Sequence, residues 1–352
     1  MFEIDPDIRK ARTLSSEFYT DERYFELSKE KIFATTWQFA GGPELKSGLT
    51  PFVLLPGFLD EPLVLARNGS EEICLANVCT HRGKVLVEEA CDANLIRCTY
   101  HGRRFSLDGK FLSMPEFEGV ENFPSEADNL RRLSLAERGG FRFVSLDPAA
   151  TFEEFGDENG CFDGIGSPVP ELVSTRDYRV NAHWALYCEN YLEGFHIPYV
   201  HRSLNEVVDY GTYTTETFRY SSVQTGFDGE GSEAGRYLFI FPNTMFNFYP
   251  WGISVNVVEP VSPAECRVRF LTYVTDRSKT GEGAGADLDK VELEDEAVVE
   301  SVQKGVRSRF YTHGRYSPTR EQGTHHFHRL IAEFMFENNL SDQERSNLAM
   351  ES

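Results

Sequence analysis

Cys79-Thr-His81 and Cys98-Thr-Tyr-His101 are the two stretches of the sequence that decide the fold of its N-terminal part. Each pairs one thiol with one imidazole at close range, and a glycine soon follows each pair, where the backbone must turn tightly. Two thiolates on one iron and two neutral imidazoles on the other form the Rieske type of [2Fe–2S] cluster. The alternative is a Cys2His2 zinc site, but such sites segregate their cysteines from their histidines. The pattern therefore favours a [2Fe–2S] cluster with four ligands: Cys79, His81, Cys98 and His101.

The bulk composition is that of an acidic chain without a membrane segment. Its 352 residues are enough for two domains with separate cores, and no apolar run approaches the roughly 20 residues that span a bilayer. Residues 1–40 hold acids and no uninterrupted apolar stretch, so we expect no signal peptide. The net charge of −21, with no basic run, would repel nucleic acid and anionic membranes. We therefore expect a cytoplasmic protein that binds neither.

The remaining cysteines show no pairing pattern, as is typical of reduced thiols in a cytoplasmic enzyme. Cys91 lies between the two motifs, but its spacing to any histidine does not suit a ligand, and we interpret it as structural.

The sequence divides into three parts. Residues 15–37 predict an N-terminal helix that Thr20 can cap. From 37 to about 147 short β runs alternate with turns, and Leu107-Asp-Gly-Lys-Phe111 predicts a hairpin. An acidic stretch rich in Gly and Pro, from about 148 to 170, predicts a linker. The predicted divisions are an N-terminal helical segment (1–37), a Rieske domain (38–148) and a catalytic domain (149–352).

The C-terminal part predicts an α+β domain. Successive strands are expected at 236–241, 245–249, 253–258 and 267–274, followed by a flexible loop at 280–286 and a long helix over 287–311. The fold class is therefore α+β: a small antiparallel β domain and a second domain with an antiparallel sheet and flanking helices.

A second candidate metal site begins with His196 and His201. On a regular helix their separation of five residues would point the side chains about 140° apart, so both could not reach one metal. Pro198 lies between them and disrupts helix, and a break or π-bulge there would bring the two imidazoles together.

A 2-His-1-carboxylate iron site needs a third ligand, which the late helix can supply. Asp295 falls within an apolar stripe of that helix, whereas Glu292 and Glu296 are expected to point away from it. A carboxylate on a buried face is costly unless it is paired, and metal coordination resolves that cost. We choose Asp295, with Glu294 as the second candidate; an ion pair of the carboxylate with Arg307 or Arg309 is the alternative without metal. The stripe consists of Val291, Val298, Val302 and Val306.

With these motifs the chain resembles the oxygenase alpha subunits of Rieske non-heme iron oxygenases. The resemblance implies a helix-grip (START-like) catalytic domain with a mononuclear Fe(II) held by His196 and His201. It also implies an acid that bridges the two metal centres across subunits, which here is Glu193, with Asn190 nearby as a weaker candidate for the site. Electrons would come from NAD(P)H through a flavin- or ferredoxin-type reductase, O2 would be the co-substrate, and the assembly would be a ring-shaped homotrimer.

Within that family the sequence is most similar to the choline, glycine-betaine and carnitine monooxygenases. The similarity rests on Phe241-Pro-Asn-Thr-Met-Phe-Asn-Phe-Tyr-Pro-Trp251, on Glu193 and on His325-His-Phe-His328. Three residues depart from the family pattern, and none is a ligand: Thr99, Arg103 and Arg202. The histidines His325, His326 and His328 lack a thiolate or acid at ligand spacing, and we interpret them as structural or as part of an oligomer interface.

The resemblance suggests a small substrate that is hydroxylated or N-dealkylated, with quaternary ammonium compounds as the candidate class. Such a cation needs an aromatic cage. The strands offer six candidates for it: Phe239, Phe241, Phe246, Phe248, Tyr249 and Trp251. Two alternatives remain open, namely an aromatic-ring dioxygenase that forms cis-diols and a Rieske electron carrier without oxygenase activity.

Overall fold

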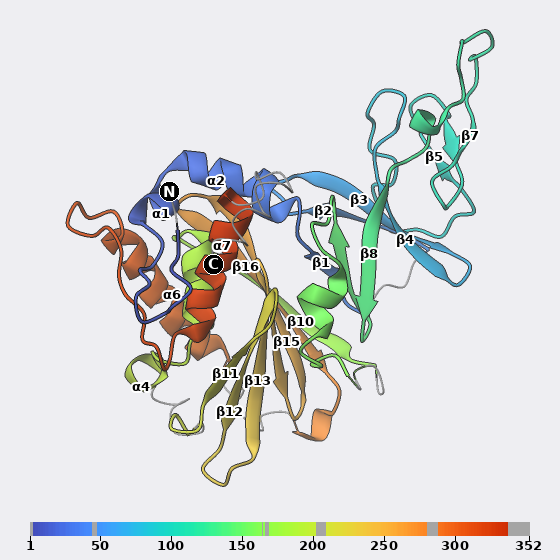
Figure 1. Cartoon of the computed structure of the whole chain (residues 1–352). Coiled ribbons are helices and arrows are strands. Elements are labelled where there is room, and N and C mark those ends of the chain that lie inside the picture. The colour runs from blue at the N-terminus through green and yellow to red at the C-terminus, as the bar shows by residue number, and fades with distance from the viewer. Residues whose placement is uncertain are drawn as a thin grey trace, which may run out of the picture.

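The computed structural model describes residues 3–43, 48–163, 165, 169–201, 209–279 and 288–336. Two antiparallel sheets lie side by side, and a narrow third sheet projects from the first at one extremity of the molecule (Figure 1). The predicted α+β class is confirmed. No described helix combines the length and the hydrophobicity that crossing a membrane would require.

The N-terminal segment is not one helix but three short ones: α1 (Ser16–Thr20), α2 (Glu22–Ser28) and the π-helical turn η1 (Lys29–Phe33). The break occurs at Asp21, whose backbone is extended and whose carboxylate accepts a hydrogen bond from the amide of Arg23 at 2.9 Å. Asp21 is therefore the N-cap in place of the predicted Thr20, which ends α1. The buried rings of Phe25 and Phe33 anchor the segment against Phe58.

The N-terminal part contains a six-stranded sheet with the strand order β1-β9-β8-β4-β3-β2. These strands are β1 (Gln38–Gly41), β2 (Leu49–Leu54), β3 (Glu61–Asn68), β4 (Glu71–Ala76), β8 (Arg132–Arg138) and β9 (Phe141–Ser145). A three-stranded sheet of β5 (Ile96–Arg97), β6 (Arg104–Phe105) and β7 (Phe111–Ser113) forms the projecting tip. The predicted hairpin is confirmed as the β6–β7 connection, where Gly109 has a φ of +86° and supplies the left-handed turn. A short 3₁₀ turn, η2 (Glu126–Asp128), follows.

The C-terminal part is built on a seven-stranded sheet with the order β10-β16-β15-β14-β13-β12-β11. Its strands are β10 (Glu171–Val180), β11 (Thr214–Thr217), β12 (Ser221–Phe227), β13 (Glu233–Ile240), β14 (Thr244–Tyr249), β15 (Gly252–Ser262) and β16 (Glu265–Val274). The four predicted strands are confirmed as β13 to β16. A 3₁₀ turn, η4 (Arg277–Lys279), ends the meander, and the loop predicted at 280–286 lies outside the described residues.

Helices cover one face of this sheet (Figure 1). They are α3 (Trp184–Tyr191), the short α4 (Ile197–Val200), α6 (Leu288–Gly305) and α7 (Gln322–Phe336). The predicted late helix is confirmed as α6, but it ends at Gly305 rather than at 311. α3 packs against α6 and against strands β15 and β16, and α6 also contacts β10, so α6, which carries the candidate ligand Asp295, is held against the sheet both directly and through α3.

The predicted linker is in part a packed segment. It contains the π-helical turn η3 (Glu153–Asp157), and Phe152, Phe155 and Phe162 are buried. Phe162 and the β9 ring Phe143 both contact Phe246 of β14, with ring centroids 5.2 and 6.0 Å apart. The two large sheets therefore share one hydrophobic core, and the domain limits at 37 and 148 stay a prediction.

Two candidate metal centres

The two Cys/His loops at the tip have the same backbone geometry. In the first, the amide of Cys79 donates to Lys84 O (2.8 Å) and the amide of Gly83 donates to Cys79 O (2.9 Å). In the second, Cys98 donates to Arg103 O (2.8 Å) and Gly102 donates to Cys98 O (3.0 Å). Gly83 and Gly102 have φ values of +72° and +76°, so both turns use the left-handed conformation that glycine adopts without strain.

These loops bring the four predicted cluster ligands together. Cys79 and Cys98 are buried, and the rings of His81 and His101 lie 4.8 Å apart. Burial raises the pKa of the Cys98 thiol, but hydrogen bonds from the amides of Tyr100 and His101 outweigh it, so its pKa lies below the usual value. Among the described residues His101 Nδ1 is buried without a hydrogen-bond partner, as expected of an atom that faces a metal. This donor set fits a Rieske cluster.

Arg103 departs from the family pattern, and the tip accommodates its side chain in an apolar site. Its side chain is almost completely buried, and its guanidinium carbon lies 4.7 Å from the ring centre of Phe111 and 5.5 Å from that of Phe123. Asp128 pairs with it at 2.6 Å. The cation therefore fills an apolar site as a stacking partner of aromatic rings and retains a counter-charge. Arg202, the other basic departure, lies outside the described residues.

The second centre forms where α3 ends. Leu192 leaves the helix, and the four residues of α4 then place His196 at its N-cap and His201 at its C-cap, with Pro198 in its first turn. The predicted break is thus present as a new, short helix. The two imidazole rings lie 5.0 Å apart at an interplanar angle of 77°.

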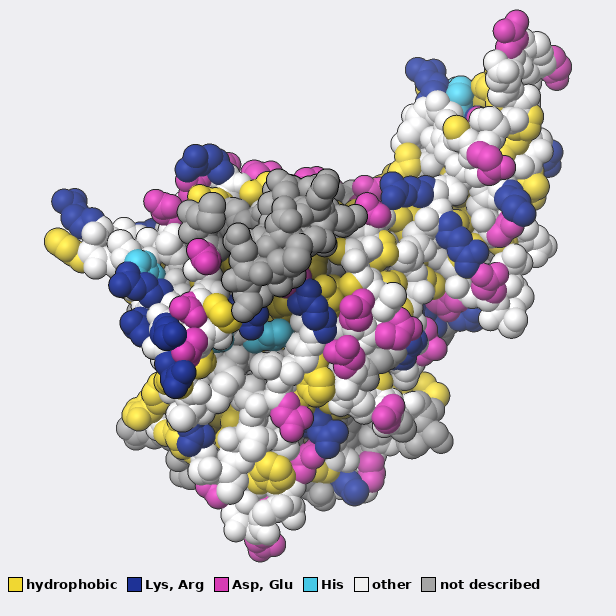
Figure 2. Space-filling model, in the orientation of Figure 1, with side chains coloured by type: hydrophobic (Ala, Val, Ile, Leu, Met, Phe, Trp, Pro, Cys, Tyr) yellow, Lys and Arg dark blue, Asp and Glu magenta, His cyan; other side chains and the backbone are white. Residues whose placement is uncertain are grey.

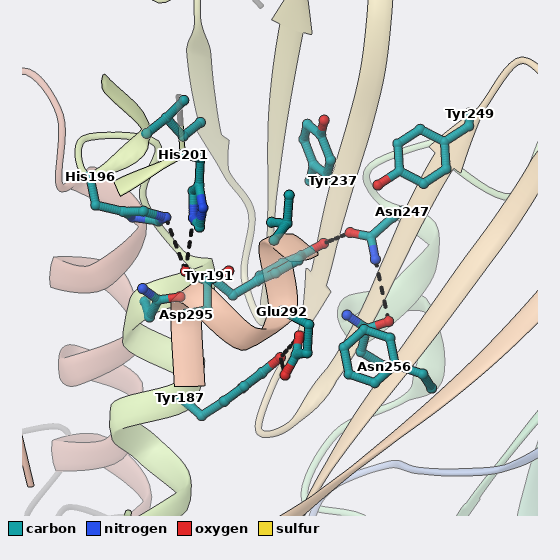
Figure 3. Close-up of a pocket in the computed structure, with 14 residues that line it drawn as sticks. Tyr187, Tyr191, His196, His201, Tyr237, Asn247, Tyr249, Asn256, Glu292 and Asp295 are labelled. Carbon is teal, nitrogen blue, oxygen red and sulfur yellow. Dashed lines mark hydrogen bonds and ion pairs between the residues drawn. The ribbon is translucent and has the colours of Figure 1, made fainter. Parts of the chain in front are cut away.

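α6 brings an acid to these histidines. Asp295 Oδ1 lies 3.0 Å from His201 Nε2 and 3.5 Å from His196 Nε2 (Figure 3). One donor atom from each of the three residues lies within 4.8 Å of the others, which is a spacing that one metal ion can bridge. Two imidazoles and one carboxylate are the donor set of non-heme iron sites with open coordination positions. In the described part of the chain, Asp295 pairs with these histidines and not with Arg307 or Arg309.

Two further carboxylates hold the opposite edges of the imidazoles. Glu193 Oε1 accepts from His196 Nδ1 at 2.7 Å, and Glu294 Oε2 accepts from His201 Nδ1 at 2.8 Å. Nδ1 is thereby the protonated nitrogen and Nε2 is left free for a metal. Burial lowers the pKa of His201, but Asp295 and Glu294 outweigh this effect and raise the pKa overall. The geometry favours Asp295 as the ligand and Glu294 as its supporting carboxylate.

The buried face of α6 differs from the predicted stripe. Val302 is 42% exposed, whereas Val299, Gln303 and Val306 are buried. Glu292, which was expected to point away, is only 5% exposed. The prediction was wrong at Val302 and Glu292, although Val306 is buried and Val291 lines the pocket. Apolar residues alone defined the stripe, while the buried face also carries polar side chains that serve a pocket and the neighbouring helix.

A pocket lies between the three-residue centre and the sheet. Asn190, one of the predicted site residues, lines it together with both histidines and Asp295. The pocket's aromatic lining is mainly tyrosine. It includes Tyr249, which was predicted, and four residues that sequence reasoning missed: Tyr187, Tyr191, Tyr237 and Phe270. Tyr191 donates to Asn247 Oδ1 at 2.9 Å, and Asn247 in turn contacts Asn256, which gives the wall its polar groups (Figure 3).

Of the six aromatic residues predicted for the cage, Tyr249 lines the pocket and the other five do not. Phe239 and Phe241 are on the correct face of the sheet, but Phe327 of α7 covers both. Phe246 and Phe248 face the other side, against Phe162. Trp251 follows β14 and stacks on Tyr249 at 5.1 Å. The correct strands were identified, and the alternation along β13 could have indicated Tyr237 had the covering helix been known.

The C-terminal histidines have structural contacts. His325 Nε2 lies 2.8 Å from the carbonyl of Asp5, and the buried His328 lies between Glu189 (3.0 Å) and Tyr316. Tyr19 donates to the same Glu189 at 2.7 Å, so this network connects α7, α3 and the N-terminal segment. At the start of α7, Gly323 approaches the C-terminal end of α3 so closely that an added Cβ would lie 2.4 Å from the carbonyl oxygen of Leu192.

Comparison with known proteins gives the same two parts. The family described as "Ring hydroxylating alpha subunit (catalytic domain)" matches residues 171–337, and the Rieske [2Fe-2S] domain matches residues 55–124. The chain is 31% identical to a chloroplastic choline monooxygenase of Arabidopsis thaliana, over 94% of this chain and 85% of the relative. It is 32% identical to the carnitine monooxygenase oxygenase subunit of Escherichia coli (strain K12), over 92% and 94%.

Solved structures show the same similarity. The quaternary ammonium Rieske monooxygenase CntA with L-carnitine superposes with a TM-score of 0.78 at 27% identity, covering 95% of this chain and 99% of that one. Another structure of a quaternary ammonium Rieske monooxygenase (26% identity, TM-score 0.79, covering 95% and 98%) is described in terms of carnitine oxidation and inter-subunit electron transfer. Naphthalene 1,2-dioxygenase shares the fold, with a TM-score of 0.71 at 19% identity and coverage of 92% of both chains.

Proposed function

The chain belongs to the Rieske oxygenases with a ring-hydroxylating alpha subunit, and we propose that it hydroxylates or N-dealkylates a small quaternary ammonium compound. As a member of this family it is an oxidoreductase that uses O2, with a Rieske [2Fe–2S] cluster and a mononuclear iron as cofactors. Electrons reach it from NAD(P)H through a flavin- or ferredoxin-type reductase. The observation that carries the proposal is a tyrosine-lined pocket that opens onto His196, His201 and Asp295.

In this proposal His196, His201 and Asp295 hold the mononuclear iron, and Cys79, His81, Cys98 and His101 hold the cluster. The iron supplies O2 activation and the cluster supplies single electrons. Glu193 and Glu294 fix the orientation and the tautomer of the two histidines by accepting from their Nδ1 atoms. The tyrosine rings enclose the substrate and exclude water from the reacting atoms.

The aromatic pocket suits a quaternary ammonium group. The rings of Tyr237 and Tyr249 meet at 78° with their centres 6.2 Å apart, so they form two adjoining walls of a corner. A trimethylammonium group placed against each ring gains roughly 0.5–2 kcal/mol per contact. Tyr187 and Tyr191 provide further ring surface closer to the metal centre. Of these four residues, Tyr249 alone belonged to the predicted cage.

We further propose that electrons pass between subunits of a ring-shaped homotrimer. Within one chain the β5–β7 tip and the α3–α4–α6 centre lie in different parts of the molecule (Figure 1). Each carries exposed aromatic surface suited to docking: Tyr100 at the tip is 55% exposed, and Phe195 and Tyr199 beside the centre are 39% and 79% exposed. Glu193, whose carboxylate already accepts from His196, is placed to receive a cluster histidine of the neighbouring copy.

The test is product formation by the purified enzyme with a ferredoxin-type reductase and NADH. The substrates are choline, glycine betaine, carnitine and several aromatic acids, and mass spectrometry identifies the products. Formaldehyde or an aldehyde from an ammonium compound supports the proposal. A cis-diol or phenol from an aromatic acid contradicts it in favour of a ring dioxygenase. Reduction of the cluster with no product from any compound also contradicts the proposed substrate class.

A further inference from the structure

We propose that Glu292 selects substrates by charge, favouring a cation without a carboxylate, such as choline, over zwitterions such as carnitine. This inference deepens the proposed function and rests on it. Overall identity does not separate the two classes, because the chain is 31% identical to a choline monooxygenase and 32% identical to a carnitine monooxygenase subunit. The side chains that line the pocket are what separates the two substrate classes.

Glu292 is a buried carboxylate that faces the pocket without a cationic partner. Tyr187 donates to both of its oxygens, at 2.8 and 2.7 Å (Figure 3). No ion pair of Glu292 is found among the described residues. Burial raises the pKa of Glu292 to about 8, and the nearby carboxylates of Asp295 and Glu296 act in the same direction. A charged carboxylate in this position lacks a counter-charge, and a bound cation supplies one.

The rest of the lining is acidic or neutral. Asp295 adds a second carboxylate, and the side chains of Asn190, Asn247 and Asn256 contribute amides. None of the lining residues in the described part of the chain is lysine or arginine. A quaternary ammonium group in the tyrosine corner is therefore attracted by Glu292, whereas the carboxylate of a zwitterion would meet no lysine or arginine among the described residues of the lining. The amides can donate to or accept from the hydroxyl group of an amino alcohol.

The size and shape of the pocket cannot produce a preference for choline over its carbon isostere 3,3-dimethylbutan-1-ol, because the two differ only in charge. Their affinity ratio thus isolates the electrostatic contribution of the pocket. Glu292→Gln keeps the shape and an acceptor for the Tyr187 hydroxyl but removes the charge. Glu296→Gln is a matched control, because Glu296 lies one turn later on α6 and does not line the pocket.

The experiment measures anaerobic binding of choline, 3,3-dimethylbutan-1-ol and carnitine to the holoenzyme by titration calorimetry at pH 8.5. We expect the unmodified enzyme to prefer choline to its isostere and to carnitine. Glu292→Gln should reduce the choline-to-isostere ratio about 10-fold, and should bind carnitine at least as tightly as the unmodified enzyme does. Glu296→Gln, which keeps the charge of Glu292, should leave the ratio within about 2-fold. The visible spectrum of the cluster verifies that each variant is folded.

A ratio that Glu292→Gln leaves unchanged overturns the inference, as does a preference of the unmodified enzyme for carnitine. In both cases the enzyme still oxidises an ammonium compound, so the proposed function stands. If no ammonium compound is bound or oxidised, the proposed function fails first.

Discussion

The Rieske tip and the mononuclear centre are assembled in opposite ways. The tip takes its four donors from two loops of matching geometry that are close in the sequence, and it projects from the body (Figure 1). The mononuclear centre joins His201 to Asp295 of α6, which lies 94 residues further along the chain, and it borders a pocket. The projecting tip suits electron transfer to a partner, and the pocket beside the mononuclear centre suits the enclosure of a substrate. The two arrangements therefore match the two different proposed roles.

The buried charges distinguish the two centres, whereas the exposed charges do not. Acidic and basic side chains are interspersed over the face in Figure 2, where both the body and the tip are visible. At the tip the buried cation Arg103 has the carboxylate of Asp128 as its partner. In the pocket Glu292 has a tyrosine hydroxyl as its partner and no cation among the described residues.

The largest expected effect separates the two centres by iron content. Asp295→Ala should lose the mononuclear iron, about one per chain, and with it all turnover, while the visible spectrum of the cluster persists. Cys98→Ser should do the reverse, losing the cluster and keeping the mononuclear iron. Iron and sulfide analysis together with the visible spectrum makes the measurement. If Asp295→Ala retained its full iron content, the ligand assignment would move to Glu294.

A smaller effect is expected where the centres communicate. Glu193→Gln should retain both cofactors but reduce product formation about 100-fold, because the carboxylate that accepts from His196 Nδ1 is replaced by a neutral amide. Single-turnover kinetics should show slow reoxidation of a cluster that is still reduced normally by the reductase. Glu22→Gln, on an exposed N-terminal helix, is the matched control and should behave as the unmodified enzyme. Normal reoxidation in Glu193→Gln would contradict the bridging role.

The smallest expected effect is on the free energy of unfolding of the iron-free protein. The titrating groups that cause it all lie in the C-terminal part. Burial raises the pKa of Glu292 to about 8, so the folded state holds a proton that the unfolded chain releases above about 4.5. The contribution of protonated Glu292 to the free energy of unfolding is therefore lost as the pH rises through 8. It decreases by roughly 2 kcal/mol between pH 6.5 and 8. Burial lowers the pKa of His183 to about 3 and that of His326 to about 4. Each of these two histidines lowers the free energy of unfolding by roughly 1.4 kcal/mol per pH unit as the pH falls below 6.5, because the histidine is protonated there only in the unfolded chain.

Urea unfolding at several pH values makes this measurement. The stability of the unmodified protein should reach its maximum near pH 6.5 and decrease on both sides. Glu292→Gln should flatten the alkaline side and steepen the acid side, because it removes the contribution that offsets one of the two histidines. An alkaline side that is unchanged in this variant would show that Glu292 is already ionised in the folded protein.

The tip could be predicted almost completely from the sequence because its information is local. Each of its signals spans only a few residues: two Cys/His pairs, two glycines and a hairpin. The turns at Gly83, Gly102 and Gly109 have the expected left-handed conformation. The proximity of His196 and His201 could also be predicted from local sequence, because Pro198 between them predicts a break in the helix. Short-range sterics decide these features.

The pocket could not be predicted in the same way because tertiary contacts decide it. Phe239 and Tyr237 lie on the same face of β13, and only the position of Phe327 on α7 determines which ring is covered. Glu292 was expected to point away because hydrophobicity defined the buried face of α6, and a functional carboxylate is the residue that violates that rule. Likewise, the single helix expected at 15–37 is broken by the extended backbone of Asp21.

The contact between Gly323 and Leu192 has a consequence for interpreting natural variants. Any side chain at position 323 would press on the carbonyl that ends α3, directly before Glu193 and the histidines of α4. A substitution there would displace the iron ligands without touching them, and the resulting enzyme would have the phenotype of an active-site mutant. Position 323 is distant from the ligands in the sequence and carries no reactive group, so a survey of harmful alleles that weighs only chemistry would classify it as neutral.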